Sequence, residues 1–192
     1  MSTNSLPTGA RNEEFFPPTN LARLPDRDDW ADATEKGRQH LDQAGKSLVE
    51  SLGYYPEPAK PEGGDTYILV EEPPEAPEFN DAAACIIIDP DEPFDHPQDR
   101  FDGLTPTEYA LAPKKSGVYG SKHLVIAVAG QRLRMYCRNP EASYGTADPA
   151  DTFFELDLAT LPADHAGYLQ LLFAAEALRP GGSCYQILEY GR

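Results

Sequence analysis

The apolar positions of the chain recur with helical spacing in its first third. Between Asp28 and Gly53, apolar or small residues return at intervals of three, four and seven, which places one stripe along a single helix. Asp28 or Asp29 can cap its start, and Gly53 follows its end. The stripe consists of Trp30, Gly37, Leu41, Ala44, Leu48 and Leu52. Because Gly37 and Gly45 lower helix propensity, packing must hold this helix.

Runs rich in β-branched and aromatic residues predict strands in the rest of the chain. These runs lie at 66–72, 84–89, 122–129, 132–138 and 152–158. Three successive isoleucines in the second run are typical of a strand that is covered on both faces, at the centre of a sheet. The third and fourth runs flank Gly130-Gln131, which predicts a hairpin with a tight turn.

Three further elements are predicted in the second half. Thr105 as N-cap, a proline directly after it and Glu108 three residues on form a capping box, which predicts a short helix near 106–115. The segment 161–178 is apolar on most faces and predicts a helix that stops at a Pro-Gly-Gly sequence, and a last short element covers 184–190. Helices and strands in this order predict an α+β fold with a mixed sheet flanked by helices.

The N-terminal segment has a different composition. Residues 1–27 contain four prolines among polar residues, which predicts an irregular Pro-rich leader. Phe15, Phe16, Leu21 and Leu24 are apolar enough to form short docking elements, either against the body of the protein or against a partner.

The net charge is concentrated in one part of the chain. The 192 residues carry 32 Asp or Glu and 16 Lys or Arg, a formal net charge of −16. All of this charge falls within 1–112, which hold 24 acidic and 8 basic residues, whereas 113–192 hold 8 of each. A single α/β domain is expected over 28–192, acidic over 28–112 and neutral after it. A chain of this charge is not expected to bind nucleic acid or an anionic membrane alone.

Cysteine usage and hydropathy point to an intracellular protein. Cys85, Cys137 and Cys184 are far apart and form no CxxC pair, so we expect buried small apolar residues and neither a disulfide framework nor a zinc site. No stretch is apolar and long enough to span a bilayer, and the N-terminus lacks the apolar centre of a signal peptide. The expected location is the cytoplasm.

Catalytic signatures are incomplete. The sequence has no GxSxG, GxxxxGK[ST] or HExxH motif, and no GxGxxG follows a strand. The acidic segment 89–102 could be a calcium loop, but Pro93 interrupts the ligand spacing, which favours a solvated loop. Asp81, Asp89 and Asp95 could form a nuclease magnesium site, but no strand carries the Glu-x-Lys triplet that such a site needs. These gaps favour a non-enzymatic protein without metal or cofactor.

Basic residues gather on the predicted hairpin. They are Lys122, Arg132, Arg134 and Arg138, and strand alternation places the three arginines and Tyr136 on one face. This strip could contact phosphate or a partner protein, or it could pair with the acidic residues of the first half.

The second half also resembles a known family. The run TPTEYALAPKKSGVYGSKHLVIAVAGQRLRMYCR, the strand FFELDL and the helix GYLQLLFAAEAL follow one another as in the N-terminal region of large type II restriction-modification DNA methyltransferases, including relatives in phage-defence clusters. Arg134, Met135 and Tyr136 match an "RLY"-like strand of that region. The resemblance covers 113–192 and implies a restriction-endonuclease-like core, here degenerate because Glu-x-Lys is missing.

The resemblance implies a function within a larger assembly. In that family a helical spacer and a methyltransferase domain follow, whereas this sequence ends at Arg192. We therefore expect a non-catalytic accessory or scaffold subunit of a DNA modification, restriction or antiviral defence complex. It would dock onto a larger methyltransferase-like or helicase-like protein, meet DNA only through the complex and have no membrane partner. Two alternatives stay open, namely an acidic DNA-mimic inhibitor of a DNA-binding enzyme and a divergent magnesium-dependent nuclease.

Overall fold

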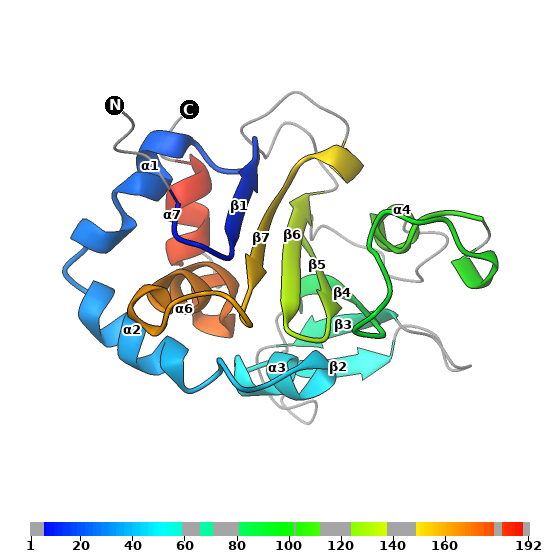
Figure 1. The fold of residues 1–192 in the computed structure, drawn as a ribbon, viewed down its shortest axis with the longest axis horizontal. Coiled ribbons are helices and arrows are strands. Elements are labelled where there is room, and N and C mark those ends of the chain that lie inside the picture. The colour runs from blue at the N-terminus through cyan, green and yellow to red at the C-terminus, as the bar shows by residue number, and fades with distance from the viewer. Residues whose placement is uncertain are drawn as a thin grey trace.

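A single mixed sheet forms the centre of the protein (Figure 1). The computed structural model describes residues 6–58, 66–70, 81–101, 103–111, 124–137, 149–178 and 182–189. Within them the sheet has seven strands in the order β1-β7-β6-β5-β4-β3-β2. The strands are β1 Ala10–Glu13, β2 Tyr55–Pro58, β3 Thr66–Val70, β4 Asp81–Ile88, β5 Leu124–Ala129, β6 Arg132–Cys137 and β7 Phe153–Asp157. β4 and β5 are parallel, and all other neighbours are antiparallel.

Helices lie on both sides of this sheet, which confirms the predicted α+β class. They are α1 Pro18–Ala22, α2 Trp30–Arg38, α3 Gly45–Ser51, α4 Pro106–Leu111, α6 Gly167–Phe173 and α7 Ser183–Glu189. Short 3-10 turns complete them, at η1 Leu24–Asp26, η2 Asp99–Phe101, η4 Pro149–Asp151, η5 Ala163–His165 and η6 Ala175–Leu178. In Figure 1, α1, α2, α6 and α7 gather on one side, and α4 lies on the other.

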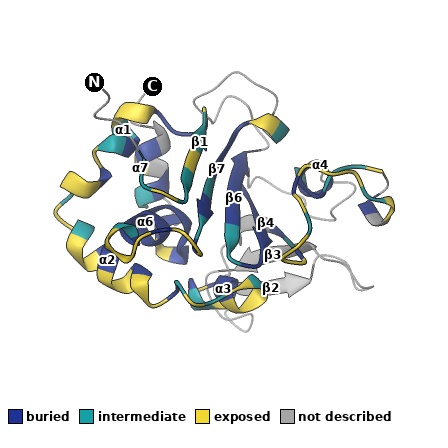
Figure 2. Ribbon diagram, viewed as in Figure 1, coloured by how far each residue is buried: buried dark blue, intermediate teal, exposed yellow. Residues whose placement is uncertain are grey.

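Each face of the sheet carries its own cluster of buried apolar side chains. The larger cluster joins Ile126 and Met135 to the leader and to α2, α3, α6 and α7. The smaller cluster joins Ile86 and Val125 to Phe94 and to the side chains around α4. Alternate residues of β5 and β6 therefore contribute to opposite clusters, and both strands are buried along almost their whole length (Figure 2). Burial on both faces explains the continuous apolar sequence of β5.

The strands and turns with strong local signals are where the sequence predicts them. The five predicted strands appear as β3 to β7, and the isoleucine-rich β4 lies inside the sheet between β3 and β5. The β5–β6 hairpin turns at Gly130, which has φ +63°. The capping box is also confirmed, because the Thr105 amide donates to Glu108 Oε1 at 3.0 Å and the Glu108 amide donates to Thr105 Oγ1 at 3.1 Å.

The N-terminal segment differs from the irregular leader expected over 1–27. Residues 10–13 form β1 along the edge of β7, and α1 and η1 follow. Each of these two helical segments has a proline in its first turn, where a missing amide costs no hydrogen bond. The predicted docking residues have at most 1% of their surface exposed and belong to the larger cluster: Phe15, Phe16, Leu21 and Leu24. The described part of the leader is thus a component of the core.

The single helix predicted over 28–52 is wrong, because the chain breaks between α2 and α3. Gly45 has φ +58°, which interrupts helical geometry, while Gly53 ends α3 as expected. The hairpin turn of β5–β6 holds the break. Gln131 Nε2 donates to the carbonyls of Leu41 at 2.7 Å and Gln43 at 3.2 Å, and the Gly45 amide donates to Gly130 O at 2.8 Å. These bonds satisfy backbone groups that a continuous helix would have paired internally.

The C-terminal helical segment is also shorter than predicted. The expected helix over 161–178 consists of η5, the seven-residue α6 and η6. All seven residues of α6 are buried, which agrees with a sequence that is apolar on most faces. The last predicted element is the helix α7.

Helices α2 and α6 touch through glycines. A Cβ atom on Gly37 would collide with the carbonyl of Ala166, and one on Gly167 would lie 2.6 Å from the Trp30 ring. Gly37 belongs to the apolar stripe of the sequence and faces α6 here. Gly37 has no side chain, which lowers its helix propensity but allows the two backbones to approach closely.

We predict that Gly37→Ala lowers the free energy of unfolding. The added methyl group gives up to about 1 kcal/mol of helix propensity, but forcing the helices apart costs roughly 1–3 kcal/mol. Chemical denaturation measures the net change. Gln39→Ala, at an exposed position two residues further on, is the control and should have little effect. A more stable Gly37→Ala protein would contradict this packing.

Candidate functional site on strands β1, β7 and β6

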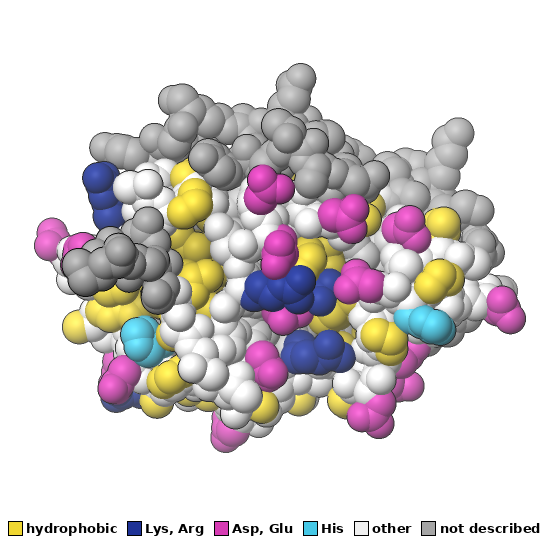
Figure 3. Space-filling model, turned by 45° about the horizontal axis from the view of Figure 1, so that its top comes forward, with side chains coloured by type: hydrophobic (Ala, Val, Ile, Leu, Met, Phe, Trp, Pro, Cys, Tyr) yellow, Lys and Arg dark blue, Asp and Glu magenta, His cyan; other side chains and the backbone are white. Residues whose placement is uncertain are grey.

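Strand register brings charged residues together on one face of β1, β7 and β6. Arg11 lies opposite Glu155, and Glu155 lies opposite Arg134, so charges of alternating sign cross three strands. The loop after β4 adds acidic residues beside them. We call this surface the charged face, and it consists of Arg11, Glu13, Asp91, Glu92, Asp95, Arg132, Arg134 and Glu155. Figure 3 shows Lys and Arg side chains surrounded by Asp and Glu on one side of the molecule.

Arg134 lies at the centre of the charged face and is almost fully buried, with 6% of its surface exposed. Its Nε donates to Glu155 Oε1 at 2.6 Å, and its Nη1 donates to Asp95 Oδ2 at 3.0 Å and to the Tyr136 hydroxyl at 3.1 Å. Burial alone lowers the pKa of Arg134, but Tyr136 and Glu155 outweigh it and raise the pKa above its ordinary value. The guanidinium therefore keeps its charge inside the protein.

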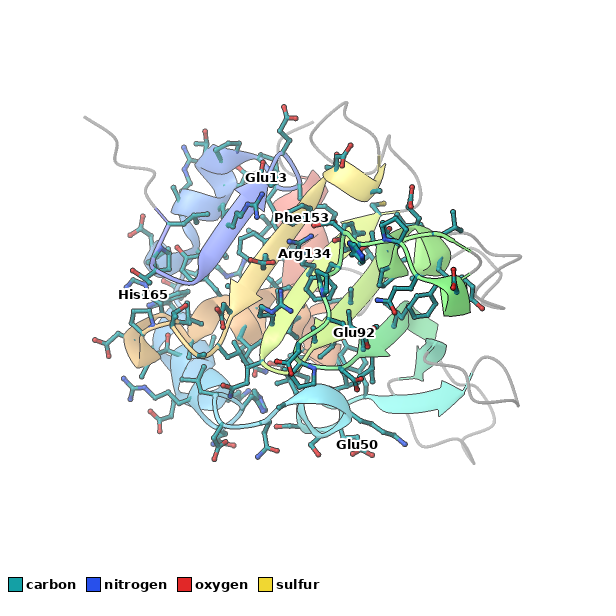
Figure 4. The ribbon with its side chains drawn as sticks, turned by 45° about the vertical axis from the view of Figure 1, so that its right-hand side comes forward. Glu13, Glu50, Glu92, Arg134, Phe153 and His165 are labelled. Atoms are coloured by element: carbon teal, nitrogen blue, oxygen red, sulfur yellow. The ribbon has the colours of Figure 1, made fainter. Side chains whose placement is uncertain are left out.

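Two aromatic rings enclose the same guanidinium. Its central carbon lies 4.0 Å from the centre of the Phe153 ring and 4.8 Å from that of Phe94. Such stacking stabilises a desolvated cation. Figure 4 shows Arg134 beside Phe153 near the middle of this face, with Glu13 at its β1 edge and Glu92 in the loop after β4.

Arg132 fastens that loop to the sheet. Its Nη2 donates to the carbonyl of Glu92 at 3.0 Å and to that of Pro90 at 3.3 Å, and its guanidinium lies 5.1 Å from the centre of the Phe94 ring. Arg132 and Arg134 thus both contact the Phe94 ring of this loop.

A buried hydroxyl pair extends the network to α4. Thr107 Oγ1 lies 3.1 Å from the Tyr136 hydroxyl oxygen and donates to the Phe94 carbonyl at 3.4 Å. Burial raises the pKa of Tyr136, although Arg134 opposes this effect. Tyr136 is therefore a neutral member of the network, and it links the arginine to the helix that covers the smaller cluster.

The predicted basic strip is only partly exposed to a ligand. Arg132, Arg134 and Tyr136 share one face as strand alternation predicts, and Arg134 pairs with an acid of the first half, one of the options that the sequence leaves open. Its guanidinium is enclosed and cannot reach phosphate. Lys122 and Arg138 lie outside the described residues.

Sequence reasoning missed the β7 side of the charged face. Phe153 and Glu155 alternate along TFFELDL in step with the arginines of the neighbouring strand. This alternation was the signal that could have paired them. Phe15, Phe16, Leu21 and Leu24, the candidate docking residues, belong to the larger cluster on the other side of the sheet and not to this face.

The three aspartates of the alternative nuclease site do not come together. Asp81 begins β4 and Asp89 follows its end, which separates their backbones by roughly 25 Å at the usual rise of a strand. Asp95 pairs with Arg134 instead. Across the described residues, no group of three or more His, Cys, Asp or Glu side chains could hold a metal ion.

The three cysteines are buried free thiols, as predicted. Burial raises the pKa of Cys85 and of Cys184 well above the ordinary thiol range. Both are therefore protonated and inert near neutral pH, since the thiolate is the reactive form.

A second polar cluster surrounds His40, between the α2–α3 turn and α6. His40 Nδ1 is hydrogen-bonded with Ser51 Oγ, and its Nε2 lies 3.3 Å from Gln170 Oε1. Gln170 Nε2 donates to Glu176 Oε1 at 2.6 Å, so its oxygen faces the imidazole. Burial lowers the pKa of His40, partly offset by Gln170. A neutral ring then donates from Nε2 to Gln170 and accepts from Ser51 at Nδ1. The sequence gives no sign of this cluster because its members are far apart in the chain.

Comparison with known proteins assigns the chain to no group. No family model, no curated protein and no solved structure matches it. In the part of the chain that the structure describes, none of the helices has the length and apolar composition needed to cross a membrane.

We predict that Arg134→Met strongly destabilises the fold, by about 3 kcal/mol, because it leaves the Glu155 carboxylate, only 16% exposed, without its hydrogen-bonded counter-charge. Asp95→Asn should cost at most about 1 kcal/mol, since that side chain is 61% exposed. Denaturant titration of each variant gives these values. The double variant Arg134→Met/Glu155→Leu should recover much of the loss. Equal costs for the Asp95 and Arg134 variants would contradict a buried pair with Glu155.

We predict a loss of stability on mild acidification that depends on His40. Because folding lowers the pKa of His40 below its ordinary value of 6.5, the unfolded chain takes up a proton more readily. The contribution of His40 to the free energy of unfolding is complete above pH 6.5 and is lost as the pH falls through the lower pKa of the folded state. Unfolding free energies measured between pH 7.5 and 5 should have a shallower slope for His40→Gln. His96→Gln, in an exposed loop, is the control and should keep the slope.

Proposed function

We propose that the protein is a non-catalytic accessory or scaffold subunit of a DNA modification, restriction or phage-defence complex. It docks onto a larger protein that carries the catalytic domain, such as a DNA methyltransferase or a helicase-like enzyme. The resemblance of residues 113–192 to the N-terminal region of restriction-modification methyltransferases supports this proposal. The mixed sheet flanked by helices is compatible with a degenerate restriction-endonuclease-like core.

One observation carries the docking part of the proposal: on the charged face the basic side chains are engaged within the protein, whereas several acidic side chains are exposed. The arginines at its centre are engaged inside the protein, because Arg134 is buried and Arg132 holds loop carbonyls. The carboxylates around them are much more open, with 61% of the Asp95 side chain and 43% of the Glu13 side chain exposed. The face therefore offers negative charge to the outside from a rigid support.

Such a surface suits a basic partner. Opposite charges on two proteins speed their encounter and fix their orientation. The negative charge of this surface also repels the phosphates of nucleic acid and so disfavours DNA as a direct ligand. The loop that presents Asp91 and Asp95 is fixed to the sheet by Arg132 and Arg134, so little ordering is needed on binding. Contact with DNA then comes through the partner, in agreement with the overall charge of −16.

We predict that the tagged full chain, purified from cells of the producing organism at low salt, brings with it a methyltransferase-like or helicase-like protein. Mass spectrometry identifies the partner, and its recovery should fall steeply in 0.5 M NaCl because the interaction is electrostatic. A stable monomer that recovers neither class of protein would contradict the proposal.

Matched variants test whether the charged face is the contact. The triple variant Glu13→Gln/Asp91→Asn/Asp95→Asn should reduce recovery of the partner at least tenfold. The control Asp32→Asn/Glu35→Gln/Asp42→Asn removes the same charge from α2 and the turn after it, on the other side of the sheet, and should bind normally. Equal losses in both variants would assign the effect to net charge alone. Competition between DNA and this protein for the partner would instead support the DNA-mimic alternative.

A further inference from the structure

A hollow of about 350 Å³ lies between the leader and α7, on the side of the sheet away from the charged face. Its walls are Asn20, Arg23, Leu24, Arg27, Gln186 and Ile187. This volume is at the small end of the range for ligand pockets, about 300–1,000 Å³. The exposed lining of the hollow is mainly apolar, although Leu24 and Ile187 are themselves almost completely buried, with 0% and 7% of their surface exposed.

The two arginines of this hollow differ in what they bind. Arg27 Nε and Nη2 donate to the two carboxylate oxygens of Asp29 at 2.8 and 3.1 Å, and Nη1 donates to Gln186 Oε1 at 3.0 Å. Arg27 is thus fully engaged and braces the wall. The exposed guanidinium of Arg23 has no hydrogen-bond or ion-pair partner among the described residues, in a chain whose acids outnumber its basic residues two to one.

Asn20 supplies a third kind of group. Its Nδ2 donates to the Ile187 carbonyl at 3.1 Å, which fixes the amide and leaves Oδ1 as an acceptor without a partner in the described part of the chain. The hollow therefore combines a mainly apolar lining, a cation and a hydrogen-bond acceptor. These groups complement an aliphatic side chain, a carboxylate and an amide N–H respectively.

We propose that this hollow, which we call the Arg23 pocket, binds the C-terminal residue of a partner polypeptide that ends in an aliphatic amino acid. Arg23 pairs with the terminal carboxylate, Asn20 Oδ1 accepts the hydrogen bond of the last amide N–H, and the side chain lies on the apolar part of the lining beside Ile187. This site does not depend on docking through the charged face, since the two surfaces lie on opposite sides of the sheet.

N-acetyl-L-leucine is the probe, because it carries all three groups of such a chain end. Titration into the ¹⁵N-labelled full chain at constant ionic strength should give saturable amide shifts at Asn20, Arg23, Leu24 and Ile187, with a Kd on the order of 1 mM for a ligand of this size. N-acetyl-L-leucinamide lacks the charge and 4-methylpentanoate lacks the amide. Each should bind about tenfold more weakly or worse, since one hydrogen-bonded contact is lost.

The variants separate this site from general attraction of anions. Arg23→Gln should weaken binding at least tenfold, as loss of the ligand's charge does, without moving resonances outside the pocket, because the side chain is exposed. Arg11→Gln removes the same charge from β1 and should bind normally. Absence of saturable shifts up to 50 mM probe, equal binding of the leucinamide, or unchanged binding by Arg23→Gln would each overturn the proposal. Preference for 4-methylpentanoate would overturn the chain-end assignment in favour of a free aliphatic acid.

Discussion

The buried charge of Arg134 is the constraint on which the face of the sheet that carries the smaller apolar cluster depends. A guanidinium inside a protein must keep its counter-charges and hydrogen bonds, or the fold loses several kcal/mol. Glu155 supplies one carboxylate only if β7 lies beside β6. Asp95 supplies the other only if the loop after β4 crosses the sheet and places Phe94 against the arginine. Once that loop is closed, the smaller apolar cluster is covered and α4 has a surface to pack on.

Local signals predicted the fold where neighbours in sequence decide the structure. The isoleucines of β4, the Gly130-Gln131 turn and the Thr105–Glu108 capping box each contain their own explanation. The break between α2 and α3 does not, because the groups that hold it come from Gln131, far along the chain. The irregular conformation expected for the leader was wrong for a similar reason: docking of Phe15 and Phe16 against the body was one of the options, but the sheet on which they pack is not revealed by composition.

In the candidate site, too, the sequence predicted the features set by neighbouring residues and missed those set by tertiary contacts. Alternation along β6 correctly placed Arg132 and Arg134 on one face, and it left pairing with acids as one option. Which acid would be used depended on the path of the loop after β4, a tertiary feature. The cluster of His40, Ser51 and Gln170 had no sequence signal at all, because a helix break and a helix packing decide it together.

The position of β1 has a consequence for how the protein is made. Its hydrogen-bonding partner is β7, so the strand at one edge of the sheet waits for a segment that is synthesised much later than β1 itself. Until then Phe15, Phe16 and Leu21 have no core to enter and remain accessible to chaperones or to other nascent chains. The sheet can therefore be completed only after β7 has been synthesised, and a translation product truncated before β7 would expose the apolar segment that the folded protein hides.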